Sequence, residues 1–310
     1  MANVVLNRDD WRAWLRANSN WGRWGADDQK GALNLIDDAK RAAAAAEVRQ
    51  GRCVSLARDL MTRPGPANPQ PVQHFVRWFH HAPRPDTARP GGGAGEYLGL
   101  HVHGYQGTHI DALCHAWGER GMWNGRDPNA ELAPQGARWG GLEHWKSGVI
   151  TRAVLLDVAG HRGVEHVEFD RPVHGDELEA VARAQGVTIG AGDAVIVHAG
   201  RDALERARPD WNPNTDPHPG LSLTALKFLR AHDVAVLAWD LMDAQPFELG
   251  WPLVPHAALW ELGIALIDNC SLDTAVAACR AAGRSAGMLV VAPLPLVGGT
   301  GSPVNPLFIL

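Results

Sequence analysis

The sequence predicts an α/β fold built as one domain, with a helical extension of about fifty residues at its N-terminus. Short apolar segments alternate with helix-like segments through the second half of the 310-residue chain. This alternation is typical of βαβ units, in which helices connect parallel strands. The first fifty residues instead mix polar and apolar side chains as helices do. Because 45% of the residues are hydrophobic and 20% are charged, the chain can bury a sizeable core.

Residues 1–50 form the expected helical extension, and residues 51–310 form the expected α/β domain. An alanine-rich run over residues 39–48 predicts a helix that ends near Gly51. A short strand is expected at residues 53–57. Residues 63–95 are expected to be a loop because prolines recur in them and three consecutive glycines follow. A loop of that length suggests a functional lid or an oligomer arm, in which Phe75 and Trp78 would cover an apolar substrate.

The second half of the chain contains the clearest strands and helices. Strands are expected at residues 153–158, 194–198, 234–239, 264–267 and 289–292, and helices at residues 176–185, 222–231 and 272–282. The first of these helices begins with acidic residues and is followed by Gly186, which are common start and stop signals. The second begins at Ser222, a residue type that caps helix N-termini, and repeats leucine at helical spacing.

Charge and cysteine content exclude several classes of protein. The net charge is −5 without a basic cluster, so nucleic acid is not expected as a partner. The sequence has no run of about 18 apolar residues, so neither a membrane-spanning helix nor a membrane partner is expected. The first residues lack the layout of a secretory signal, and the four cysteines are scattered without paired spacing. A reduced, cytoplasmic location fits these features best.

The stretch from His101 to His115 carries the strongest chemical signal. His109 and Asp111 are two residues apart, and side chains at that spacing share one face of a strand. An imidazole and a carboxylate that converge on one point are typical ligands of a divalent metal. His101 and His103 lie upstream with the same parity. We therefore expect a metal-dependent hydrolase; the alternative is a histidine and an aspartate that only pack in the core.

Residues 107–115, Gly-Thr-His-Ile-Asp-Ala-Leu-Cys-His, resemble the signature of the cyclase-type metal hydrolases, a family that includes bacterial kynurenine formamidase and isatin hydrolase. The segment at residues 24–35 resembles the N-terminal segment of its longer members, and those at residues 219–222 and 298–306 also resemble family segments. The resemblance implies a single α/β domain around a curved or barrel-like mixed sheet. It also implies zinc or manganese as the metal and assembly as a homodimer or homotetramer. The reactions of this family open amide or lactam carbonyls.

The signature of the formamidase-like members, His-x-x-x-His-x-Asp-x-x-x-His, carries over onto three positions of this chain. Its second His and its Asp correspond to His109 and Asp111 as metal ligands, and its last His corresponds to His115 as a proton shuttle. Its first His corresponds to Tyr105, a poor ligand because a phenol has a pKa of about 10. His103 would substitute for that ligand; the alternative is that it hydrogen-bonds a neighbour while Tyr105 faces the substrate.

Family members with two metals use a further His and Glu, twelve residues apart, in the C-terminal half. His256 and Asp268 have this spacing, and Asp268 follows the expected strand at residues 264–267. Because aspartate is one methylene shorter than glutamate, one ion is expected, and a second depends on whether this carboxylate reaches it. His256 would otherwise be a loop histidine. Glu261 is a competing carboxylate, but its segment is expected to be a solvent-exposed helix end.

The expected reaction is the opening of a C–N bond beside a carbonyl, by metal-activated water, in a small aromatic or cyclic molecule. His115 would take the proton of that water and return it to the leaving nitrogen. The resemblance favours formamidase-like substrates of tryptophan catabolism or an isatin-like ring. Two alternatives stay open: a metal-dependent cyclase, lyase or lactone hydrolase on the same site, and a catalytically silent metal-binding homologue.

Overall fold

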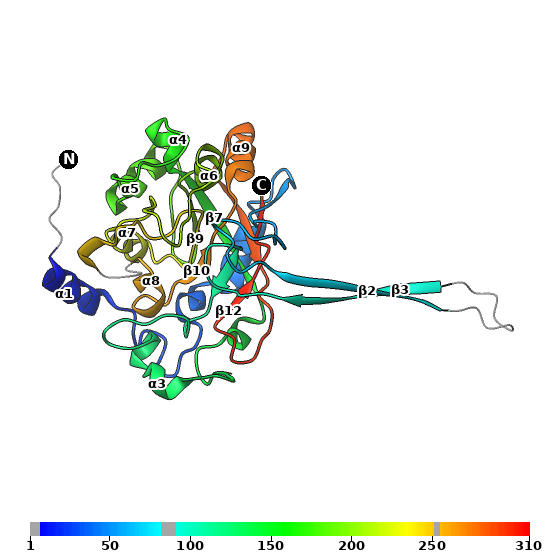
Figure 1. Ribbon diagram of the computed structural model, residues 1–310. Coiled ribbons are helices and arrows are strands. Elements are labelled where there is room, and N and C mark those ends of the chain that lie inside the picture. The colour runs from blue at the N-terminus through cyan, green and yellow to red at the C-terminus, as the bar shows by residue number, and fades with distance from the viewer. Residues whose placement is uncertain (1–6, 82–90, 251–254) are drawn as a thin grey trace.

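The computed structural model describes residues 7–81, 91–250 and 255–310. Within these residues, a mixed sheet of nine strands forms the centre of the molecule, and helices lie around it (Figure 1). The spatial order of its strands is β1 (Cys53–Ser55), β13 (Leu307–Ile309), β11 (Ala286–Val291), β7 (Val149–Asp157), β8 (Ala194–His198), β9 (Val236–Trp239), β10 (Ala265–Asp268), β4 (His109–Asp111) and β12 (Gly301–Pro303).

The four central strands β7, β8, β9 and β10 run parallel, and helices connect them. The connecting helices are α4 (Val158–Arg162), α5 (Gly175–Ala184), α6 (Arg201–Ala207), α7 (Ala225–Ala231) and α8 (Ala257–Trp260), and α9 (Asp273–Ala282) leads on to β11. Strands β8, β9 and β10 are buried along their whole length, as parallel strands covered on both faces are. The expected βαβ organisation is confirmed.

The sheet curls because the C-terminal segment belongs to both of its ends. β12 pairs with β4 at one end, and β13 pairs with β1 and β11 near the other, yet only residues 304–306 separate β12 from β13. Three extended residues span about 11 Å at most, far less than the width of a flat sheet of this size. Ser271, after β10, also donates its backbone N–H to Leu56, after β1. The curved, barrel-like sheet is confirmed.

A long hairpin, which we call the arm, projects from the body of the molecule (Figure 1). Its strands β2 (Gln73–His81) and β3 (Gly91–Gly99) pair in antiparallel register from one end to the other. The expected loop over residues 63–95 is therefore wrong for these strands, because backbone pairing accepts the glycines and the prolines lie outside the paired residues. The part of that expected loop at residues 82–90 lies outside the described residues.

The N-terminal segment packs against the sheet and its helices. α1 (Arg8–Asn18) buries Trp11, and α2 (Asp38–Ala45) packs on β7 and β11. In the 3-10 helix η1 (Gly31–Leu35), a β-carbon on Gly31 would lie 2.3 Å from the Gly263 oxygen, so this close approach requires glycine. The remaining elements are η2 (Trp123–Gly125), α3 (Pro128–Glu131), β5 (Leu132–Ala133), β6 (Gly136–Ala137), η3 (Leu142–Trp145) and η4 (Glu248–Gly250). Among the described helices, none combines the length and the apolar character needed to span a membrane.

Candidate metal centre

Strand β4 holds two of the predicted ligands beside the end of β10. Its residues, His109–Asp111, are all buried, and the strand lies between β10 and β12. His109 and Asp111 share one face, with His109 Nε2 3.5 Å from Asp111 Oδ1. In the antiparallel register of β4 and β10, His109 lies opposite Asp268, whose Oδ2 is 3.9 Å from His109 Nε2. Strand pairing thus brings a second carboxylate to the pair.

Two further imidazoles, His103 and His115, lie on the more exposed side of this pair. His103 Nδ1 lies 2.9 Å from Asp111 Oδ1, and His115 Nε2 lies 3.8 Å from Asp111 Oδ2. The two rings stack with their centroids 3.7 Å apart, and His103 Nε2 contacts Thr300 Oγ1 at 3.0 Å. The side chains of His103 and His115 are 29% and 22% exposed, whereas Asp111 is fully buried. Both imidazoles therefore contact the same carboxylate from the solvent side.

His256 and Asp268 come to the same place from two other elements. His256 immediately precedes α8, and Asp268 ends β10. His256 Nε2 lies 3.3 Å from Asp268 Oδ2, so the shorter aspartate side chain does reach the imidazole. Trp239 Nε1, at the end of the adjacent strand β9, donates a hydrogen bond to Asp268 Oδ1. That bond leaves Oδ2 facing His109 and His256. We call the following six residues the central cluster: His103, His109, Asp111, His115, His256 and Asp268.

The donor atoms of the central cluster suit a divalent metal. Two groups of three residues offer ligand atoms that all lie within 4.8 Å of one another. The first subsite consists of His103, His109 and Asp111, and the second subsite consists of Asp111, His256 and Asp268. Both Asp111 oxygens are buried, and no hydrogen-bond donor in the described structure is aligned with either. A buried carboxylate in this state is costly unless a cation compensates it. Imidazole with carboxylate is a ligand set that zinc and manganese accept.

Surrounding groups set the protonation of the cluster. His109 Nδ1 contacts the Gly107 carbonyl at 2.9 Å; because a carbonyl only accepts, Nδ1 carries the proton and Nε2 presents its lone pair. Although burial acts in the opposite direction, the imidazoles of His115 and His109 lower the pKa of Asp111. Burial lowers the pKa of His115 to about 4, so its ring is neutral at pH 7. The site therefore combines an ionised carboxylate at Asp111 with a neutral imidazole at His115.

Tyr105 lies near the carboxylates of Asp243 and Asp268, and its hydroxyl group forms hydrogen bonds with two neighbours. Its hydroxyl lies 3.2 Å from His218 Nε2 and accepts a hydrogen bond of 3.1 Å from Gln245 Nε2. His218 Nδ1 faces a backbone carbonyl at 3.1 Å, so Nδ1 carries the proton and Nε2 accepts from the tyrosine hydroxyl. Burial, followed by the charge of Asp243, raises the pKa of Tyr105 to about 12. The phenol therefore stays protonated at neutral pH and acts as a hydrogen-bonding group.

Phe75 and Trp78, the two predicted substrate-binding aromatics of the arm, do not join the cluster within one chain. Both lie on β2, in the hairpin that Figure 1 shows projecting from the body. Phe75 stacks on Tyr97 of the opposite strand with ring centroids 5.8 Å apart. Phe75 is 60% exposed and Trp78 is 73% exposed. Their apolar surface therefore faces solvent.

Trp239 and Asp243 contact the cluster but were not predicted from the sequence. Trp239 ends β9, and Asp243 follows in the next loop with Oδ2 2.5 Å from His256 Nδ1. Although burial opposes it, the charges of Asp243 and Asp268 raise the pKa of His256 well above its ordinary value. A usable signal existed, because carboxyl ends of adjacent parallel strands meet at one edge of a sheet. The polar residues after β9 could have been assigned to the edge at which Asp268 ends β10.

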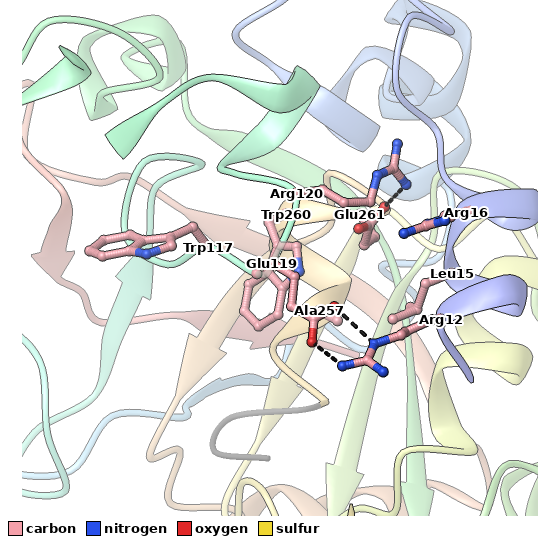
Figure 2. Close-up of a pocket in the computed structure, with 10 residues that line it drawn as sticks. Arg12, Leu15, Arg16, Trp117, Glu119, Arg120, Ala257, Trp260 and Glu261 are labelled. Atoms are coloured by element: carbon pink, nitrogen blue, oxygen red, sulfur yellow. Dashed lines mark hydrogen bonds and ion pairs between the residues drawn. The ribbon is translucent and has the colours of Figure 1, made fainter. Parts of the chain in front are cut away.

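A cleft of about 310 Å³ lies along α8 (Figure 2). Some of the residues that line it are close in sequence to residues of the cluster. Trp117, two residues after His115, and Trp260, four residues after His256, line it. Figure 2 shows two ion pairs among the residues that line the cleft. These pairs join Arg120 to Glu261 at 3.2 Å and Arg12 to Glu119 at 2.6 Å. The cleft is therefore an apolar hollow with charged walls.

Glu261 is buried, so the expected solvent-exposed helix end is wrong. Its exposed fraction is 3%. The chain after α1 covers it: Asn20 donates its backbone N–H to the Glu261 carbonyl at 2.9 Å, and Ser19 Oγ donates to the same oxygen at 3.1 Å. Burial raises the pKa of the Glu261 carboxyl, which pairs with Arg120 and not with the central cluster.

Comparisons with known proteins are consistent with this fold. The chain matches the family model of the cyclases over residues 69–246. A solved structure described as a novel cyclase is 25% identical, and the match covers 96% of this chain and 99% of that one with a TM-score of 0.82. An isatin hydrolase bound to the product analogue thioisatinate is 18% identical, with 86% and 95% of the two chains covered and a TM-score of 0.54.

A predicted metal-dependent hydrolase from Bacillus stearothermophilus resembles this chain about as much as the isatin hydrolase does. It is 15% identical, with 83% of this chain and 97% of that chain covered and a TM-score of 0.51. At these identities, the likeness to the isatin hydrolase and to this hydrolase concerns the fold. A search of curated proteins gave no match.

Proposed function

The chain belongs to the cyclase family, and on this premise we propose that it is a metal-dependent hydrolase whose metal site is the central cluster. The observation that carries the proposal is the state of Asp111. Both of its oxygens are buried without aligned hydrogen-bond donors, and imidazole nitrogens surround them. We propose that the residues of the first subsite bind one ion and that those of the second subsite, sharing Asp111, bind another.

Other residues at the site transfer protons and orient the substrate in this proposal. When bound, a divalent ion lowers the pKa of a coordinated water and polarises a carbonyl oxygen. His115 is partly exposed, neutral at pH 7 and in contact with Asp111, so it is placed to accept a proton from water and to give it to the leaving nitrogen. Tyr105, which keeps its proton, orients the substrate. Ion-binding and proton-moving roles are therefore assigned to different side chains.

The substrate in this proposal is a small aromatic or cyclic molecule that is opened at an amide, formamide or lactam C–N bond. The isatin hydrolase of similar fold, solved with thioisatinate, supports including isatin among the candidates. The cleft along α8 supports an aromatic substrate, because Trp117, Trp260 and Leu15 line it with apolar surface and its walls include residues close in sequence to His115 and His256. Formanilides, including formylated products of tryptophan breakdown, are the other leading class.

Metal analysis combined with a substrate screen tests the proposal. Elemental analysis of the purified protein, before and after chelation, should find one or two equivalents of zinc or manganese. Hydrolysis of formanilides, isatin, cyclic imides or lactones should disappear with the chelator and return with one of these ions. Activity that persists in the fully metal-free protein contradicts the proposal. A protein that retains no ion and hydrolyses nothing is instead a catalytically silent homologue.

A second candidate, a cyclase or lyase on the same site, is favoured by the novel cyclase that is 25% identical over nearly the whole chain. Hydrolysis and ring closure differ in the fate of water. In solvent enriched with oxygen-18, a hydrolase places one solvent oxygen in the carboxyl group of its product. A dehydrating cyclase or lyase releases water and incorporates none. Mass spectrometry of the product therefore distinguishes the two reactions.

We also propose that the chain assembles with copies of itself through the arm. Phe75, Trp78 and Tyr97 are 60%, 73% and 55% exposed there. A two-stranded hairpin alone is marginally stable in water, and clustered large apolar side chains usually mark an interaction surface. Light scattering coupled to gel filtration measures the mass of the assembly. A dimer or tetramer agrees with the proposal, and a monomer at micromolar concentration contradicts it.

A further inference from the structure

Asp243 is a buried carboxylate to which the proposed reaction assigns no role. It is 2% exposed and lies in the loop that follows β9. Its backbone pairs with Leu221 in a parallel bridge, and Ala244 donates its N–H to the Leu221 carbonyl at 3.2 Å. In the described part of the chain, neither of its carboxylate oxygens has an aligned hydrogen-bond donor. Its backbone is therefore fixed, and the neighbouring His256 is the group that compensates its charge.

The imidazole of His256 lies between this carboxylate and the second subsite. Asp243 Oδ2 is 2.5 Å from His256 Nδ1, and Asp268 Oδ2 is 3.3 Å from His256 Nε2. At that distance the carboxylate attracts a proton to Nδ1, although the two atoms are not aligned as in an ideal hydrogen bond. When the ring carries a single proton, as a metal ligand must, a proton at Nδ1 leaves the lone pair of Nε2 facing Asp268 and the second subsite. Asp243 therefore determines which ring nitrogen of His256 is available as a ligand.

The same arrangement occurs at His109 with a weaker partner. There the Gly107 carbonyl accepts from Nδ1 at 2.9 Å, and Nε2 faces Asp111. A carboxylate in this position orients the ring as a carbonyl does, and it also makes the ligand nitrogen more basic. The two subsites therefore differ in the group behind their buried histidine: a neutral carbonyl in the first and a charged carboxylate in the second.

We propose that Asp243 is a positioning residue that holds His256 in the tautomer and orientation needed for metal binding, and thereby sets the affinity of the second subsite. This inference rests on the proposed metal site. It assigns no contact between Asp243 and substrate. We expect Asp243 to affect ion binding at the second subsite and not at the first, because the first subsite contains neither Asp243 nor His256.

Titration of chelator-treated protein with Mn²⁺ tests the inference without a substrate. In Asp243→Asn, we expect ion affinity at the second subsite to fall about 10- to 100-fold, while affinity at the first subsite changes less than about 3-fold. Calorimetry measures both affinities. Electron paramagnetic resonance reports on the pair directly, because two Mn²⁺ ions that share Asp111 interact magnetically. At two equivalents, the wild type should show the interacting pair and Asp243→Asn the spectrum of isolated ions.

Two further variants control for folding and handling. Asp210→Asn removes an exposed carboxylate and should titrate as the wild type does. Asp243→Ala leaves a space of carboxylate size beside His256, so added formate should restore ion affinity at the second subsite at least in part. Such rescue is expected from a positioning carboxylate and not from a residue that only keeps the chain folded. Circular dichroism confirms that each variant is folded before titration.

The outcomes separate this inference from the proposed function. If the wild type binds two ions and Asp243→Asn binds both as tightly, or loses both to the same extent without formate rescue in Asp243→Ala, the inference is overturned and the metal site stands. If the wild type binds one ion, His256→Ala shows which subsite holds it. When His256→Ala loses the ion, the ion occupies the second subsite; a tenfold loss in Asp243→Asn then supports the inference, and an unchanged affinity overturns it. When His256→Ala keeps the ion, the second subsite binds none and the inference is overturned. If the wild type binds no ion, the proposed function fails and the inference fails with it.

Discussion

Replacing Asp111 by asparagine tests the central cluster without knowledge of the substrate. Asp111 is 0% exposed and belongs to both subsites, so Asp111→Asn should lose both ions. The substitution preserves the size of the side chain and removes its negative charge. Since no donor in the described structure is aligned with the Asp111 oxygens, few hydrogen bonds depend on that charge. The metal-free variant should therefore fold as the metal-free wild type does.

The size of the effect follows from the linkage between ion binding and unfolding. An ion present at a hundredfold excess over its Kd stabilises the folded state by about 2.7 kcal/mol. A chain of 310 residues has an unfolding entropy of roughly 0.65 kcal/mol/K at about 2.1 cal/mol/K per residue. Saturating ions should therefore raise the wild-type Tm by about 4 °C for one subsite and about 8 °C for two. In Asp111→Asn, we expect a rise of less than about 1 °C.

Differential scanning calorimetry of chelator-treated protein, with and without Mn²⁺ or Zn²⁺, measures these shifts. Asp210→Asn, which removes an exposed carboxylate, provides the matched control and should respond as the wild type does. Elemental analysis of the same samples links each shift to bound metal. An equal rise in Asp111→Asn and in the wild type would refute the reasoning, because the ions would then bind elsewhere. No rise in either protein would show that the cluster holds no ion.

His115→Ala should lower kcat by about 10²- to 10⁴-fold, roughly 3–5 kcal/mol of barrier, with unchanged metal content by elemental analysis; a wild-type kcat would remove this residue from proton transfer. Although burial opposes it, the 2.7 Å contact with Asp157 raises the pKa of His198 to about 9. The stability that this contact gives the folded protein is therefore complete below about pH 6.5 and is lost as the pH rises through 9. Between pH 7 and 10, urea denaturation should show a free energy of unfolding that falls by about 3 kcal/mol more in the wild type than in His198→Gln, and parallel curves would contradict this. Trp78→Ser should reduce the mass of the assembly measured by light scattering without changing the number of ions bound per chain; an unchanged mass would exclude the exposed aromatic side chain from the interface.

Elements whose pattern is local were predicted well. The apolar runs at β8 and β9 and the glycine that follows α5 are properties of short segments, so the βαβ order follows from them. The arm was missed because its strands carry glycines and exposed aromatics, and the side chains described at residues 73–78 and 93–99 form no buried face. Such strands form through backbone pairing with one another, which leaves no hydrophobic alternation to detect. Glu261 was misplaced for a related reason: the residues that cover it lie about 240 positions earlier in the chain.

The sequence by itself determined that His109 and Asp111 share a face, because alternation along a strand depends only on two neighbouring dihedral pairs. The resemblance to the cyclase-type metal hydrolases also identified His256 and Asp268 as a candidate pair. Tertiary structure alone decided that all four side chains meet. That meeting requires β4 to pair with β10 so that His109 lies opposite Asp268. The partner of His256, Asp243, likewise depends on how the loop after β9 packs, and packing between distant segments is not encoded in local spacing.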